Sequence, residues 1–173
     1  MKNTMLEMSR YAALARQAVA EGVVLLKNEA VLPLAPGGRA ALFGYAQFHY
    51  YKSGTGSGGL VNVTHVQNLP EILGGDGGYR LDAEVQARYA AWLADHPYEM
   101  GTGWAQEPWF QPEMPLDEKF VCAAAQRADT AFIVIGRTAG EDQDNTNTPG
   151  SFLLTEDEEN MLALVCRYFN KSV

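Results

Sequence analysis

One short loop carries most of the residues that could do chemistry. It follows the apolar run 131–135, whose β-branched residues and terminal glycine predict a buried strand. The loop holds Arg137, Glu141, Asp142 and Asp144. Carboxyl groups are among those that transfer protons in enzymes, and loops at the carboxyl ends of strands in open α/β sheets hold ligands. Glu141 is therefore our main candidate, although acids in a surface loop are often simply solvated.

The same stretch has a counterpart in a known family. Residues 135–144, Ile-Gly-Arg-Thr-Ala-Gly-Glu-Asp-Gln-Asp, resemble the second-domain segment of glycoside hydrolase family 3, where a Gly-Glu-Gly-x-Asp-Arg-like motif follows a hydrophobic strand. In that family the motif Glu is the general acid/base, so the resemblance assigns this role to Glu141. Asp142 stands where glycine is usual. Asn145 stands where arginine is usual, so no salt bridge is expected from that position.

Two further segments resemble the same family. Residues 18–34 are similar to its lead-in to the second domain, where a helix ends in a Leu-Leu-Lys-Asn stretch before the first strand. Residues 149–158, Pro-Gly-x-x-Leu-Leu-Thr-x-x-Glu, are similar to its entry into a later helix. The three matches occur in the family's order across almost the whole chain. We expect a structural role for the lead-in segment, residues 18–34.

A glycine-rich loop at residues 52–59 could bind a ligand. Its glycines fit the pattern G-x-G-x-x-G, but about nine residues separate it from the preceding strand and an extended run follows it. A dinucleotide fingerprint follows its strand directly and opens a helix, so nucleotide binding ranks third among our hypotheses. A similar loop in family 3 borders the active-site mouth. We therefore predict that Ser53, Thr55 and Ser57 contact sugar.

Residues 97–115 form a long segment with four prolines and several aromatic side chains. Long irregular segments are often binding loops or lids. The faces of Trp104 and Trp109 suit the C–H surfaces of sugar rings, although the rings could equally pin the loop to the core. We add Arg137 and Asp144, which flank Glu141, to the predicted substrate-binding residues.

The remaining pattern predicts an α/β fold with a mainly parallel sheet. Apolar residues recur at helical spacing in several stretches, and Thr4, Asp82 and Thr155 are suitable N-caps. Expected helices cover residues 4–26, 66–73 (interrupted by Pro70), 81–96, 116–128 and the stretch after 155; expected strands cover 39–44 and 131–135. The resemblance implies a six-stranded α/β sandwich, of which residues 1–173 would form roughly the first three quarters. A further strand should begin near residue 171.

Composition excludes several classes of function. The net charge of −8 and pI of about 4.8 argue against a nucleic-acid partner. The three histidines have no metal-ligand spacing, and Cys122 and Cys166 are expected to be core thiols, so we predict no metal or cofactor. Neither a signal peptide nor a membrane span is visible, and we expect a cytoplasmic protein without a membrane partner.

The resemblance implies a retaining β-glucosidase-like glycosidase that acts on a β-glucoside or oligosaccharide. Such hydrolysis needs two carboxyl groups about 5–5.5 Å apart, and the family's Asp nucleophile lies on a barrel domain that this chain does not resemble. The expected partner is therefore the remainder of its own polypeptide, and we expect residues 1–173 to be unstable without it. A homo-oligomer stays open. The alternative is a non-catalytic carbohydrate-binding or scaffold domain.

Overall fold

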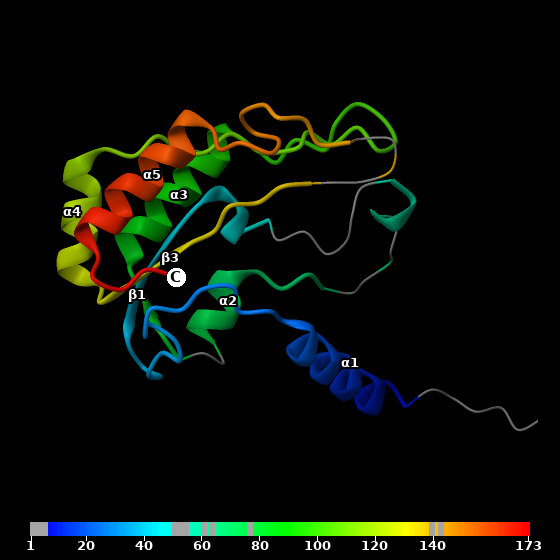
Figure 1. The fold of residues 1–173 in the computed structure, drawn as a ribbon, viewed down its shortest axis with the longest axis horizontal. Helices are drawn as coiled ribbons and strands as arrows, with labels where there is room; N and C mark the ends of the chain where they lie inside the picture. The colour runs from blue at the N-terminus through cyan, green and yellow to red at the C-terminus, as the bar shows by residue number, and fades with distance from the viewer. Residues whose placement is uncertain are drawn as a thin grey trace, which may run out of the picture. The chain divides into compact units, whose positions relative to one another are not determined.

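The computed structural model describes residues 7–49, 56–59, 62, 65–75, 78–138, 141 and 144–173 (Figure 1). The chain divides into two compact units, Met1–Pro33 and Leu34–Val173, which are described separately. None of the helices in these described stretches combines the length and apolar character that a bilayer crossing requires.

In the first unit, the described residues 7–33 contain one helix and a turn. Helix α1 spans Met8–Gly22 and has no side-chain hydrogen bond at its N-cap, Glu7. The predicted cap Thr4 lies outside the described residues. Beyond the helix, the Asn28 side chain accepts hydrogen bonds from the backbone N–H groups of Val31 and Leu32, both at 3.0 Å. These two hydrogen bonds close a turn at residues 28–32.

The second unit is built on a parallel sheet. Strand β1 (Arg39–Phe43) lies between β2 (Arg80–Leu81) and β3 (Thr130–Ile133). Both pairings are parallel, and Phe43 lies opposite Ile133 in the register with β3. Residues 171–173 run parallel to β3, where the Ala131 N–H donates to the Lys171 carbonyl at 2.9 Å. The predicted α/β class is confirmed, and this last pairing lies where a further strand was expected.

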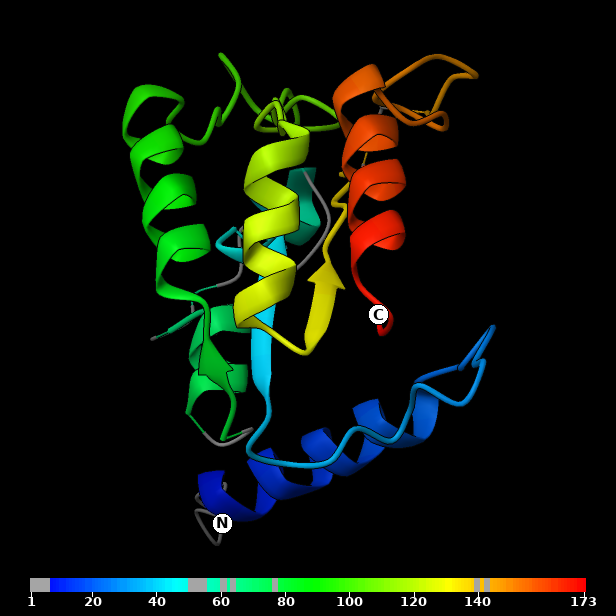
Figure 2. The same ribbon diagram turned by 90° about the vertical axis from the view of Figure 1, so that its left-hand side faces the viewer.

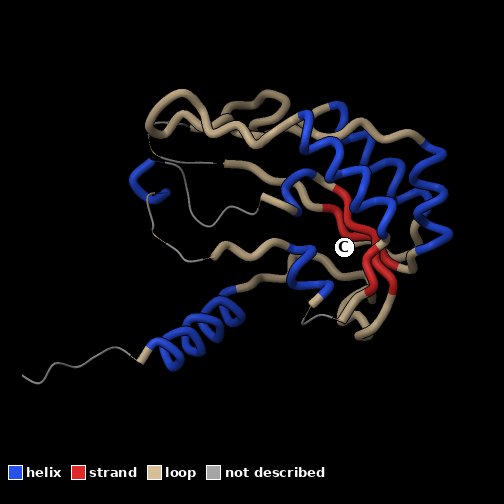
Figure 3. Tube along the Cα trace, turned by 180° about the vertical axis from the view of Figure 1, so that it is seen from behind, coloured by secondary structure: helices blue, strands red, loops and turns tan. Residues whose placement is uncertain are grey.

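Three helices cover one face of this sheet. Figure 2 shows α3 (Ala83–Asp95), α4 (Glu118–Arg127) and α5 (Glu156–Tyr168) side by side in front of β1 and β3. The short helix α2 (Leu69–Gly74) lies on the other side, against β2 (Figure 3). The core between sheet and helices includes Phe43, Val85, Tyr89, Val121, Met161 and Val165, all fully buried. Each such side chain contributes about 1.5–3 kcal/mol on burial.

Local capping signals set most helix starts. The side chains of Asp82 and Thr155 accept hydrogen bonds from the third residue of α3 and α5, as predicted. Asn68 forms a capping box with Glu71, so α2 begins at Leu69 and Pro70 lies in its first turn. The prediction that Pro70 interrupts a longer helix was wrong, because proline is tolerated where the backbone N–H has no helical partner.

The cysteine prediction also needs correction. Cys122 is half-buried and Cys166 is exposed, and both are free thiols. The sequence pattern around residue 166 is apolar, but the buried side of α5 is formed by Met161, Leu164 and Val165. Cys166 therefore lies on the outer side of the helix and is not a core residue.

Candidate active site

The candidate loop leaves β3 at the carboxyl edge of the sheet. Val134 continues the pairing, since its N–H donates to the Phe43 carbonyl at 2.9 Å. Thr138 then binds the irregular segment 97–115: its N–H donates to the Trp109 carbonyl at 2.8 Å, and its hydroxyl donates to the Pro108 carbonyl at 2.7 Å. Before it reaches Glu141, the chain is thus bound to β1 at Val134 and to the segment 97–115 at Thr138.

Glu141 is exposed and binds the glycine-rich loop. Its Oε2 accepts hydrogen bonds from the Ser57 hydroxyl at 2.7 Å and from the Ser57 N–H at 3.2 Å. These bonds, the hydroxyl first, hold the pKa of Glu141 below its ordinary value. The residue that lowers this pKa therefore comes from the glycine-rich loop, 84 residues before Glu141 in the sequence.

Gly56 permits this close approach. Its φ is +73°, and a Cβ there would lie 2.9 Å from the Glu141 Cβ and 3.5 Å from the Ala105 Cβ. Only a residue without a side chain fits such a site without displacement. Three segments far apart in sequence therefore meet around Gly56, beside Glu141: the 3₁₀ turn Gly56–Gly59, the loop around residue 105, and the loop that follows β3.

The other predicted substrate-binding residues differ in their surroundings. Trp104 is 53% exposed and directly precedes the buried Ala105 in the sequence. Trp109 is half-buried, and its indole N–H has no hydrogen-bond acceptor among the described residues. Asp144 is exposed. Ser53 and Thr55 lie outside the described residues, and so does Asp142.

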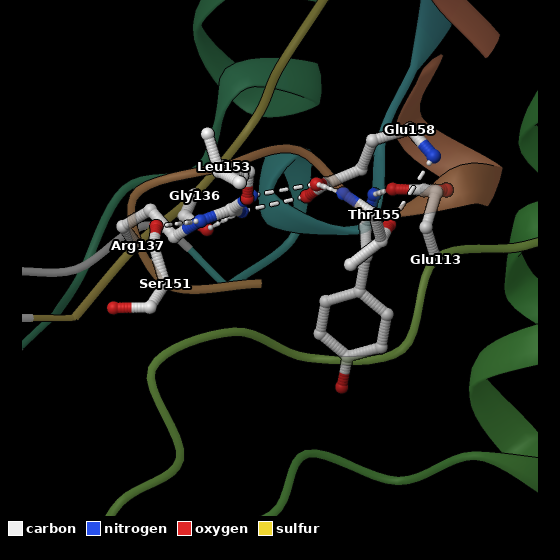
Figure 4. A network of polar contacts seen from close by, with 8 residues as sticks. Glu113, Gly136, Arg137, Ser151, Leu153, Thr155 and Glu158 are labelled. Carbon is white, nitrogen blue, oxygen red and sulfur yellow. Dashed lines mark hydrogen bonds and ion pairs between the residues drawn. The ribbon is translucent and has the colours of Figure 1, made fainter. Parts of the chain in front are cut away.

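Arg137 directs its guanidinium inward. Its Nη1 and Nη2 donate to the two carboxylate oxygens of Glu158, each at 2.6 Å. The same group donates to the carbonyls of Ser151 at 2.8 Å, Gly136 at 2.9 Å and Leu153 at 3.2 Å (Figure 4). The side chains of Arg137 and Glu158 are 20% and 5% exposed. These contacts leave the predicted sugar contact of Arg137 a prediction.

Glu158 has two partners in this network. Besides Arg137, its carboxylate accepts a hydrogen bond from the Thr155 N–H at 2.8 Å, which completes the capping box of α5 (Figure 4). Burial acts to raise the pKa of Glu158, but the hydrogen bonds from Arg137 and Thr155 outweigh it and lower that pKa. The sequence indicated the cap. It gave no signal for the ion pair.

Glu113 was missed by sequence reasoning. It is 6% exposed, and its carboxylate accepts hydrogen bonds from the Tyr45 N–H at 2.7 Å, the Met114 N–H at 2.9 Å and the Tyr89 hydroxyl at 3.1 Å. Burial raises the pKa of Glu113 to about 7 against the effect of these donors, and the nearby negative charge of Glu158 adds to the rise. An acid within an irregular, proline-rich segment has no periodicity that would reveal its burial.

Glu113 and Glu158 face a small hollow at the ends of β1 and β3. Gln111, Val134 and Gly136 also line it, and it has room for about one water molecule at most. Within the described stretches, no group of three or more His, Cys, Asp or Glu side chains could hold a metal ion. The chemistry that the described site offers is therefore proton exchange by the accessible carboxyl group of Glu141 beside a hydroxyl.

Comparisons with known proteins show the family to which this chain is similar. A model of the glycosyl hydrolase family 3 C-terminal domain matches residues 23–173. The chain is 47% identical over 168 residues to a beta-glucosidase of Ruminococcus albus, a match that covers 97% of this chain and 18% of the relative. It is 39% identical over 140 residues to beta-glucosidase A of Butyrivibrio fibrisolvens, covering 78% of this chain and 16% of the relative.

Solved structures agree with this assignment. A beta-glucosidase from Paenibacillus barengoltzii superimposes with a TM-score of 0.89 at 44% identity, over 99% of this chain and 18% of that protein. Beta-glucosidase 3B from Thermotoga neapolitana, solved in complex with glucose, gives 0.80 at 31% identity, over 94% of this chain and 23% of that protein. The chain thus spans about a fifth of these relatives' length. It belongs to glycosyl hydrolase family 3 and corresponds to the C-terminal domain of that family.

Proposed function

We propose that this chain supplies the general acid/base carboxyl group, Glu141, of a retaining β-glucosidase-like glycosidase. The observation that carries the proposal is the position of Glu141: an accessible carboxylate after a parallel strand, where segments from three parts of the sequence meet. The beta-glucosidase relatives support the reaction class. The substrate would be a terminal β-linked glucoside or oligosaccharide.

The reaction requires a second carboxyl group. In the first step Glu141 donates its proton to the leaving oxygen while an Asp nucleophile from the remainder of the polypeptide attacks the anomeric carbon. In the second step Glu141 takes a proton from water, and the resulting hydroxide equivalent releases the sugar from the nucleophile. The nucleophile would face Glu141 at about 5–5.5 Å, the spacing of retaining enzymes.

The second carboxyl group would also influence whether Glu141 is protonated. In the described chain its pKa is lowered by Ser57, whereas a general acid must be protonated at the working pH. A second carboxylate across the sugar site would act to raise that pKa, and so would the exclusion of water by substrate. We propose that Ser57, with Ser53, Thr55, Asp144, Trp104 and Trp109, lines the sugar site. The guanidinium of Arg137 binds Glu158 and three backbone carbonyls, so we do not place it in this site.

The test is Glu141→Ala in the complete polypeptide. The activity towards glucosides with poor leaving groups should fall by about 10²–10⁴-fold, because these need protonation. An activated aryl glucoside should retain more activity, and azide should restore part of the loss as an external nucleophile. Glu159→Ala, which removes an exposed Glu from the first turn of α5, is the matched control. Full activity of Glu141→Ala towards poor leaving groups would refute the proposal.

A non-catalytic sugar-binding domain is the second candidate. The lowered pKa of Glu141 favours it, because an ionised carboxylate accepts hydrogen bonds from sugar hydroxyls and cannot act as an acid. Titration calorimetry of the complete polypeptide with glucose would then show binding, while no aryl glucoside would be hydrolysed. Turnover of any such glucoside that depends on Glu141 would exclude this alternative.

A further inference from the structure

We infer that Arg137 and Glu158 act as a positioning pair that fixes where Glu141 stands. The inference rests on the proposed function, since it needs Glu141 to transfer a proton. Neither residue of the pair is required to touch the substrate. Their effect on the reaction passes through the backbone of the loop that carries Glu141.

Arg137 joins several segments of the chain. Its fork binds Glu158 in the first turn of α5, and its remaining donors bind carbonyls at Ser151 and Leu153 in the segment before that helix (Figure 4). The centroid of the Phe110 ring lies 5.9 Å from the Arg137 Cζ. The exit of β3 is therefore tied to α5 and to the irregular segment 97–115.

Glu141 lies close in sequence to this anchor. Thr138, the next residue, is 5% exposed and binds Pro108 and Trp109 through its hydroxyl and its N–H. Glu141 follows three residues later and is exposed, with Ser57 as its described hydrogen-bond partner. The described hydrogen bonds of Glu141 itself come from Ser57, and the buried anchor before it holds the start of the loop.

The types of the two side chains also contribute to the positioning. An arginine fork and a carboxylate make two parallel hydrogen bonds, which restrict orientation as well as distance. Glu158 is itself oriented by the Thr155 N–H in the capping box, and the carboxyl group of Glu113 lines the same small hollow. Lysine would keep the charge of Arg137 but lose the fork. Arg137→Lys thus changes position while largely preserving electrostatics.

A second ion pair in the same unit provides a matched control. Arg127 at the end of α4 donates to both oxygens of Asp82, the N-cap of α3, at 2.6 and 3.1 Å. It has the same chemistry and also involves a helix cap. It lies by the start of β1, since Asp82 donates its N–H to the Ala40 carbonyl, whereas Glu141 follows the opposite end of the sheet. Arg127→Lys should therefore lower stability without affecting Glu141.

The experiment measures leaving-group dependence in the complete polypeptide. Arg137→Lys and Glu158→Gln should lower kcat/KM for glucosides with poor leaving groups by about 10–100-fold, since a misplacement of about 1 Å can cost 10²-fold. Activity towards an activated aryl glucoside, which needs no proton, should fall by less than about threefold, in keeping with the specificity of acid catalysis for poor leaving groups. Arg127→Lys should lower the activities towards both classes of glucoside equally, or leave both unchanged. A structural role alone would likewise lower both activities together.

Each outcome decides one claim. If Glu141→Ala retains activity, the proposed function fails. If Glu141→Ala loses activity but Arg137→Lys and Glu158→Gln behave like Arg127→Lys, the positioning inference fails and the proposed function stands. If the pair variants do not fold, Thr138→Val decides. It removes the hydroxyl contact with Pro108, and a selective loss on poor leaving groups supports the inference, whereas an equal loss or none overturns it.

Discussion

The two ends of the loop after β3 have opposite environments. At its start, Arg137 is largely buried and binds a carboxylate and three backbone carbonyls. Four residues later, Glu141 is exposed and binds Ser57. A catalytic group needs access to substrate and a defined position at the same time. This loop separates the two requirements, because one residue provides the anchor and another provides the accessible carboxyl group.

The carboxyl groups around the loop show the same contrast in their pKa values. Burial raises the pKa of Glu113 to about 7, because its donors do not include a cation. Burial also acts on Glu158, but the Arg137 guanidinium reverses the direction and lowers its pKa. Exposed Glu141 has its pKa lowered by a hydroxyl and a backbone N–H. A buried acid that is paired with a cation is thus kept charged. A buried acid with neutral donors alone is kept neutral over part of the pH range.

Removal of the Glu158 carboxylate should have the largest effect on stability. Glu158→Ala leaves the Arg137 charge buried without its counter-ion, and breaking such a pair costs about 3–5 kcal/mol. The loss should appear in the free energy of unfolding of this domain, measured by denaturant titration of the complete polypeptide. Glu159→Ala, next to it on the exposed side of α5, is the control. A loss similar to that of the control would show that the anchor does not stabilise the fold.

Glu113 should make stability depend on pH near neutrality. In the unfolded chain this carboxyl group ionises near 4.5, and in the fold near 7. Its favourable contribution is fully present below pH 4.5 and is lost as the pH rises through 7, by about 3 kcal/mol in total. The unfolding free energy of the native protein, relative to Glu113→Gln, should therefore fall between pH 5 and 8.

Two neighbours of Glu113 do not titrate in that interval. The pKa of Tyr89 is raised well above 10 by burial first and by the charge of Glu113 second. The pKa of Glu158 is lowered, so it stays ionised. The difference between the native protein and Glu113→Gln therefore reports on Glu113. A difference that stays constant from pH 5 to 8 would show that Glu113 is ionised in the fold throughout this interval.

Sequence reasoning succeeded where the signal was local. The caps Asp82 and Thr155 are recognised from their own residue type and from the residues that follow them, and apolar runs reveal the buried strands. The boundary of α2 was missed because the capping box of Asn68 and the place of Pro70 in the first turn have to be read together. These features involve residues within three or four positions of one another.

The site depended on contacts that sequence spacing does not encode. Ser57 and Glu141 are 84 residues apart, and Arg137 and Glu158 are 21 apart. The family resemblance singled out Glu141 and the glycine-rich loop, but the partner of each side chain follows from tertiary packing. Glu113 had no signal at all, since only the fold places the backbone N–H of Tyr45 against it.

Loss of the Ser57 hydroxyl should have the smallest effect, and it examines the exposed end of the loop. In Ser57→Ala the main cause of the lowered pKa of Glu141 is removed, so that pKa should rise towards its ordinary value. If Glu141 is the general acid, activity at high pH is lost as it deprotonates. The alkaline limb of the kcat/KM profile for a poor leaving group should then move to higher pH, while the melting temperature changes little because the bond is at the surface. An unchanged alkaline limb, with Glu141→Ala inactive, would show that the Ser57 bond is already broken in the complete active site.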